Sequence, residues 1–84
     1  GLKIVSLSAN ETIRRAGTGG GAAPALRLEA RGGQQDLVWL VDGKPIGRAN
    51  VKTTLQHRFT EPGRHTITVM DEAGHYDQVE IRVQ

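Results

Sequence analysis

Apolar and polar residues alternate in several short stretches of this chain, and the alternation predicts strands. Residues 25–31 place Leu26, Leu28 and Ala30 on one face and charged side chains on the other, which is typical of a half-buried strand. Residues 37–41 are apolar on both faces, so we expect a second, more deeply buried strand there. No window shows the sustained 3.6-residue period of a helix. The pattern therefore predicts a chain made of strands.

Asp42-Gly43, directly after the second strand, is the strongest hairpin signal in the sequence. Both central residues of a type I′ turn need a positive φ, which Gly43 adopts freely. Around this turn we expect Val41 opposite Lys44.

The same count along the hairpin predicts Trp39 opposite Ile46. Pro45 has no N–H to donate to a ladder, so the returning strand is expected to be a short edge strand.

The last part of the chain predicts a closing hairpin whose register follows from parity. Residues opposite each other in an antiparallel pair point to the same face, so Ile67 should pair with Val79 and Val69 with Asp77. The loop then ends at Gly74, where a G1 bulge requires a left-handed conformation. The outward row consists of the pairs Arg64–Arg82, Thr66–Glu80, Thr68–Gln78 and Met70–Tyr76.

The remaining segments complete the prediction. We expect strands over residues 2–7 and 51–59, the second with Leu55 and Phe59 inward, a short edge piece over 11–15, and a flexible glycine-rich loop over 17–24. The whole chain, residues 1–84, is predicted to be one all-β domain. It should form an antiparallel immunoglobulin-like or fibronectin III-like β-sandwich of about seven short strands.

Composition excludes several classes of function. The chain has 11 Lys and Arg against 9 Asp and Glu, and a net charge of +2 does not indicate nucleic-acid binding. It has no cysteine, and no apolar stretch approaches the ~20 residues of a membrane span. We therefore expect a monomeric domain that is not inserted in a membrane. The glycine at position 1 suggests a domain excised from a longer chain.

The sequence shows no catalytic site, metal site or cofactor site. Residues 17–22 formally fit a dinucleotide-binding pattern but precede a proline and a strand instead of a helix. His57, His65 and His75 lack the spacing of metal ligands. We instead expect His65 to occupy a corner between strands, where its ring donates to the backbone.

Two places remain as candidate binding residues. Trp39 is expected to fill the core, with a carbohydrate-stacking platform as the alternative. The outward face of the closing hairpin, at Arg64, Met70, Tyr76 and Arg82, is the better candidate because it exposes apolar area and sets two arginines opposite each other. Solvated surface is the alternative for these four residues.

Three stretches together resemble the C-terminal domain of bifunctional penicillin-binding proteins of the 1C type. They are Leu26-Arg-Leu-Glu-Ala-Arg-Gly-Gly, Leu37-Val-Trp-Leu-Val-Asp-Gly-Lys-Pro-Ile-Gly and Phe59-Thr-Glu-Pro-Gly-Arg-His-Thr-Ile-Thr-Val-Met-Asp-Glu-Ala-Gly. In that family, a strand ending in Gly-Gly precedes a Trp-Leu-Val-Asn/Asp-Gly hairpin, then Pro-Gly and a Val-x-Asp-x-x-Gly hairpin. The match covers residues 24–84, and His65 departs from the aromatic residue usual at its position.

The resemblance implies a periplasmic domain of a membrane-anchored peptidoglycan synthase with glycosyltransferase and transpeptidase activities. The active-site motifs do not carry over: Ser8-Ala9-Asn10 and Lys52-Thr53-Thr54 mimic two of them, but there is no Ser-x-x-Lys nucleophile. The implied role is non-catalytic and lies in docking a periplasmic protein partner or cell-wall glycan. A structural spacer module of a bacterial surface or secreted protein is the alternative.

Overall fold

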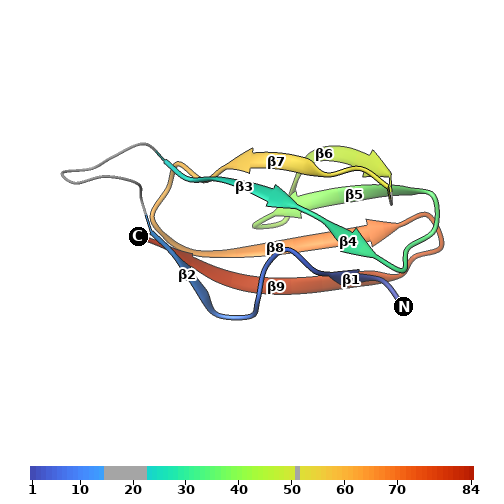
Figure 1. Ribbon diagram of the computed structural model, residues 1–84, viewed down its shortest axis with the longest axis horizontal. Helices are drawn as coiled ribbons and strands as arrows, with labels where there is room; N and C mark the ends of the chain where they lie inside the picture. The colour runs from blue at the N-terminus through green and yellow to red at the C-terminus, as the bar shows by residue number, and fades with distance from the viewer. Residues whose placement is uncertain (15–22, 51) are drawn as a thin grey trace.

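A computed structural model describes residues 1–14, 23–50 and 52–84 of the chain. Strands are the only regular elements in these ranges (Figure 1). They are β1 Lys3–Ile4, β2 Glu11–Ile13, β3 Ala25–Leu28, β4 Ala30–Arg31, β5 Asp36–Val41, β6 Lys44–Asn50, β7 Leu55–Arg58, β8 Gly63–Asp71 and β9 Tyr76–Val83.

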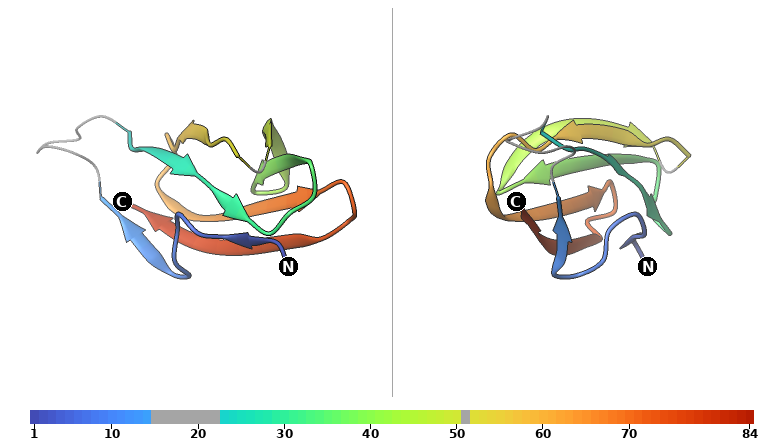
Figure 2. Two further views of the ribbon diagram at one scale, coloured as in Figure 1. Left: turned by 45° about the vertical axis from the view of Figure 1, so that its right-hand side comes forward. Right: turned by 60° about the vertical axis from the view of Figure 1, so that its left-hand side comes forward.

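The strands form two layers. One is a five-stranded sheet in the order β2-β9-β8-β5-β6, and the other is built from the pairs β1-β4 and β3-β7. Because only Glu29 separates β3 from β4, these two pairs make one continuous layer over the larger sheet (Figure 2). All pairs are antiparallel, as expected, except β2 with β9, which is parallel. A parallel pair needs a connection that crosses between layers, and no local pattern in the sequence signals one.

The core lies between the layers and takes the inward residues of both. Leu28, Ile67 and Val69 are fully buried, and the side chains of Trp39 and Phe59 are 1% and 2% exposed. Burial of each such side chain contributes about 1.5–3 kcal/mol to folding. Trp39 is thus a core residue, as predicted, and its buried ring cannot be the carbohydrate-stacking platform that was the alternative.

The closing hairpin has the predicted register. Ile67 pairs with Val79, Val69 with Asp77, and all four outward pairs are present. Gly74 has a φ of 89°, the left-handed conformation that the loop requires. Parity sufficed here because both strands bury one face only.

The β5–β6 hairpin differs from its predicted register. Asp42 and Gly43 both have positive φ, at 52° and 82°, and Val41 pairs with Lys44 as expected. Trp39, however, pairs with Gly47 instead of Ile46, because the ladder shifts by a bulge between Trp39 and Leu40.

The bulge makes Ile46 the extra residue on β6, since Leu40 pairs with Pro45 and Trp39 with Gly47. The returning strand β6 lies at the sheet edge, as predicted, but it continues to Asn50 and is not short.

Three predicted segments have different bounds. The strand over 25–31 is interrupted at Glu29, whose N–H donates to Ser6 Oγ at 2.9 Å. The strand over 51–59 is reduced to β7, because Asn50 accepts the Lys52 N–H through its side chain and holds a turn there. The segment over 2–7 keeps only β1.

Phe59 is buried and Leu55 packs partly buried against the core, as expected. The predicted loop over 17–24 lies mostly outside the described residues, as do Arg15 and Val51. In the ranges that are described, no helix has the length and apolar character to cross a membrane.

Candidate functional site

The five-stranded sheet buries one face in the core and presents the other to solvent. We call this second face the outer face, and strand alternation assigns residues to it. On β5, β8 and β9 the inward residues include Trp39, Val69 and Ile81, so their sequence neighbours point outward. The outer face therefore has contributions from four adjacent strands, β6, β5, β8 and β9.

An apolar row crosses the outer face near one end of the sheet. Val38 pairs with Met70, and Met70 pairs with Tyr76, so these side chains stand next to one another across three strands. Met70 is 41% exposed and Tyr76 is 65% exposed, while Val38 and the adjacent Leu40 are half-buried. We call these four residues the apolar row.

The opposite end of the outer face is charged. Arg64 lies opposite Arg82, and the repulsion expected between them is relieved because Arg64 Nη1 is 2.8 Å from Glu80 Oε1 on β9. Arg82 forms no ion pair with any residue that the structure describes. Both arginines line a shallow hollow of about 210 Å³ between β2 and β8.

The predicted binding residues therefore share one face but occupy two separate places. Met70 and Tyr76 belong to the apolar row, whereas Arg64 and Arg82 lie six residues away along the strands, at a distance of roughly 20 Å. The part of the apolar row on β5 was missed by sequence reasoning. A signal existed, because residues 37–41 are apolar on both faces and a sandwich strand buries only one.

His65 joins two turns at one end of the sandwich. Its Nε2–H donates to the Glu61 carbonyl oxygen at 2.6 Å, which is the predicted type of corner contact. Its Nδ1 lies 2.7 Å from Asp42 Oδ2, at the β5–β6 turn. Both ring nitrogens face acceptor oxygens, an arrangement that favours the imidazolium form, in which both nitrogens carry a proton.

The electrostatics of this contact agree with that assignment. Burial by itself would lower the pKa of His65, but the hydrogen bonds to Glu61 and Asp42 outweigh it and raise the pKa above its ordinary value of 6.5. Burial would raise the pKa of Asp42, but the Thr66 N–H and the His65 ring lower it on balance. The nearby His57 has a lowered pKa because it is partly buried and because His65 is positively charged.

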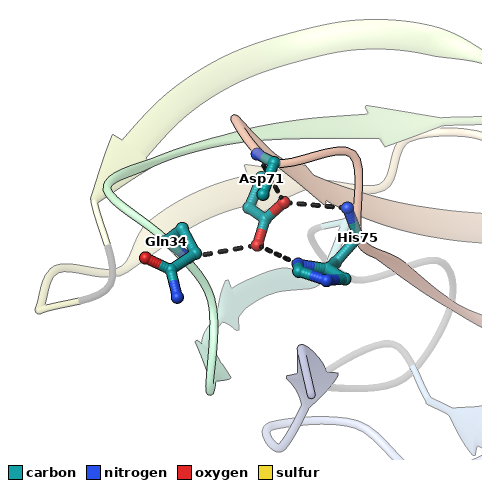
Figure 3. A network of polar contacts seen from close by, with 4 residues as sticks. Gln34, Asp71 and His75 are labelled. Carbon is teal, nitrogen blue, oxygen red and sulfur yellow. Dashed lines mark hydrogen bonds and ion pairs between the residues drawn. The ribbon is translucent and has the colours of Figure 1, made fainter.

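Asp71 organises the other end of the sandwich (Figure 3). Its carboxylate has no solvent exposure and sits at the end of β8. One oxygen accepts the N–H groups of Ala73 and His75, at 3.0 and 2.8 Å. The other accepts the Gln34 N–H at 3.1 Å and faces His75 Nδ1 at 3.0 Å.

These contacts keep Asp71 ionised. Burial would raise its pKa, but the His75 side chain and the backbone N–H groups of His75 and Gln34 lower it below the ordinary value of 3.8. Sequence reasoning placed Asp71 in a hairpin loop and missed this role. An aspartate whose side chain bonds the N–H two residues later is a recognisable turn signal.

The residues with a chance resemblance to catalytic motifs take part in local turns. Ser8 donates its N–H to the Glu11 carboxylate at 2.9 Å, and Asn10 has a positive φ of 62°. Thr53 Oγ1 accepts the Asn50 N–H at 3.0 Å. Over the residues that the structure describes, no group of three His, Cys, Asp or Glu side chains could hold a metal ion.

A comparison with solved structures agrees with the two-layer architecture. The fibronectin(III)-like modules of Clostridium thermocellum CbhA superpose with a TM-score of 0.72 at 21% identity, covering 99% of this chain and 95% of that one. At this identity the similarity shows the fold alone. The fold is an immunoglobulin-like or fibronectin III-like β-sandwich.

Comparisons of the sequence itself gave one result. A search of curated proteins found no match. The family model described as the Penicillin-Binding Protein C-terminus Family matches residues 1–83, which is nearly the whole chain and includes the resembling stretches. The chain belongs to the penicillin-binding protein C-terminus family.

Proposed function

We propose that this domain is a non-catalytic accessory module of a peptidoglycan synthase and that it docks a periplasmic protein through its outer face. The parent would be a glycosyltransferase and transpeptidase anchored in the inner membrane, which puts the domain in the periplasm. Family membership supports the parent, and the apolar row supports the docking.

The apolar row is the observation that carries the proposal. Exposed contiguous apolar surface on a soluble domain marks an interaction site more often than isolated exposed residues do. Tyr and Met are also enriched in protein interfaces. Here Met70 and Tyr76 stand beside Val38 in one line, with the arginine Arg48 next to Val38 at the edge of the sheet.

A protein partner fits this surface better than a glycan does. Glycan sites stack sugar rings on exposed aromatic rings, and Trp39 and Phe59 are both buried in the core. Tyr76 is the remaining aromatic ring, and its neighbour across the strands is Met70. A single ring continued by aliphatic side chains is suited to the mixed apolar surface of a protein.

The test is site-specific photo-cross-linking in cells that express the full-length synthase. A photoreactive amino acid at position 48, beside the apolar row, is compared with one at Gln56, which is exposed on β7 in the other layer. We expect adducts of discrete mass with another protein from position 48 and none from position 56. Adducts removed by a muramidase would overturn the proposal in favour of glycan binding. No adduct at either position would favour the spacer function.

A further inference from the structure

The charged end of the outer face carries more positive charge than its own contacts neutralise. Arg64 and Arg82 stand directly opposite each other on β8 and β9, an arrangement in which like charges repel. Glu80 compensates Arg64 alone, through the ion pair at 2.8 Å. Two arginines and one glutamate line the hollow, so one positive charge is left without a partner among the described residues.

Strand β2 brings a hydroxyl group to the same place. Thr12 is opposite Arg82 in the parallel ladder of β2 and β9, so the two side chains stand on the same face (Figure 1). Thr12 is exposed and lines the hollow beside Arg82. Within the ranges that the structure describes, the Thr12 hydroxyl makes no hydrogen bond and is free to donate one to a ligand.

The border that β2 gives the hollow is held at both ends. Before the strand, Asn10 has a positive φ of 62° and donates its N–H to the Glu80 carbonyl at 2.7 Å. After the strand, the Gln84 N–H donates to the Ile13 carbonyl at 3.0 Å and continues the ladder. The hollow is therefore part of the folded structure and does not need to form when a ligand arrives.

The donors in the hollow suit a carboxylate. A guanidinium group has five N–H donors in a planar fork that matches the two oxygens of a carboxylate. Arg64 uses Nη1 for Glu80, which leaves its Nη2 and Nε groups, and Arg82 has its whole fork available. One carboxylate carries the single negative charge that the hollow lacks. The volume of about 210 Å³ is large enough for the carboxylate end of one amino-acid side chain.

We propose that this hollow binds one carboxylate of the protein that docks on the outer face. The inference rests on the proposed function, because it takes the docked protein to be the source of the carboxylate. The hollow and the apolar row lie roughly 20 Å apart on one face. A standard interface of about 800 Å² on each partner is roughly 30 Å across and spans both places. The apolar row then supplies contact area, and the charged hollow fixes the orientation of the partner.

The first measurement is a titration of the ¹⁵N-labelled domain with the capped peptide acetyl-Gly-Glu-Gly-amide, followed by two-dimensional NMR at low ionic strength, where exposed charges are least screened. We expect saturable shifts of the backbone amides of residues 10–12 and 80–82 and of the Nε–H signal of Arg82. The matched peptide acetyl-Gly-Gln-Gly-amide has the same shape without the charge and should cause no saturable shift.

Variants place the site. Arg82→Gln should lower the association constant of the Glu peptide about fivefold, which is the upper range for an exposed ion pair. Thr12→Val keeps a β-branched side chain on β2 but removes the hydroxyl, and should lower the constant about threefold. Arg27→Gln removes an exposed arginine from β3 in the other layer and should leave the constant unchanged. Thr12→Val also serves if Arg82→Gln does not fold.

Three results would overturn the proposal. One is the same response to the Glu and Gln peptides, or no response to either. Another is an equal loss of binding in Arg27→Gln and Arg82→Gln, which would show that the charge of the whole domain attracts the peptide. The third is co-sedimentation with phosphatidylglycerol vesicles that Arg82→Gln abolishes, which would assign the hollow to lipid phosphates. The titration contains no partner protein, so the carboxylate site and the cross-link from position 48 can fail separately.

Discussion

At the scale of single residues, two aspartates hold the turns at the two ends of the sandwich, and each uses a histidine. Asp42 connects the β5–β6 turn to the start of β8 through His65, and Asp71 connects the end of β8 to the loop before β5 through Gln34. Both aspartates accept backbone N–H groups as well. Local polar contacts of this kind fix the loops that the hydrophobic core does not reach.

The His65 contact predicts a pH dependence of stability. A raised pKa in the folded state means that the stabilisation is fully present below the unfolded pKa of 6.5 and is lost as the pH rises through the folded pKa. We expect the free energy of unfolding, measured by urea titrations, to fall by up to about 1 kcal/mol as the pH rises from 6.5 through the folded pKa. Asp42 is 47% exposed, and water screens the pair.

Variants assign this dependence to the ring. His65→Gln should flatten the decline above about pH 6.5, because it removes the titrating group. His57→Gln should retain it, since the lowered pKa of His57 confines its effect to lower pH. Equal slopes in the His65→Gln variant and the original chain would contradict the imidazolium assignment.

Asp71→Asn should destabilise the domain, because the buried carboxylate accepts several hydrogen bonds. One of the two carboxylate oxygens becomes an NH2 group, which then faces either the N–H groups of Ala73 and His75 or the N–H of Gln34. Thermal unfolding followed by circular dichroism checks this, with the exposed Glu72→Gln as the matched variant that should leave the melting temperature unchanged. The lowered pKa of Asp71 also predicts that its contribution is lost only as the pH falls below 3.8.

At the scale of the element, the β8–β9 hairpin depends on its loop glycine. Gly74 has a φ of 89°, so Gly74→Ala should lower the free energy of unfolding by about 1 kcal/mol. Ala73→Gly changes the same loop at a residue without a positive φ and should cost less. Chemical denaturation of the two variants compares them. If Gly74→Ala were neutral, the left-handed turn would not be required.

The two hairpins also show what sequence reasoning can predict. Register follows from parity where both strands bury one face, as in β8–β9. It fails in β5–β6, because a bulge at Ile46 shifts the ladder and no alternation in the sequence marks its position. The parallel pairing of β2 with β9 is harder still to predict from the sequence, since it joins residues 11–13 to residues 81–83.

At the scale of the whole molecule, the two faces of the larger sheet have different roles. The inward face packs into the core and stabilises the fold. The outer face presents the apolar row, whose side chains are not part of that core. Half of the candidate site was predicted, at Met70 and Tyr76, because the hairpin register is local. The contribution of Val38 requires the pairing of β5 with β8, which is a long-range contact.

The most direct test of the docking surface is the cross-linking of the full-length parent protein from position 48 with Met70→Lys added. Met70 is partly exposed, so we expect this change to alter the free energy of unfolding of the domain by less than about 0.5 kcal/mol. The account predicts that the protein adduct disappears while the domain stays folded. An adduct of undiminished yield from the folded variant would contradict the claim that the apolar row is the docking surface.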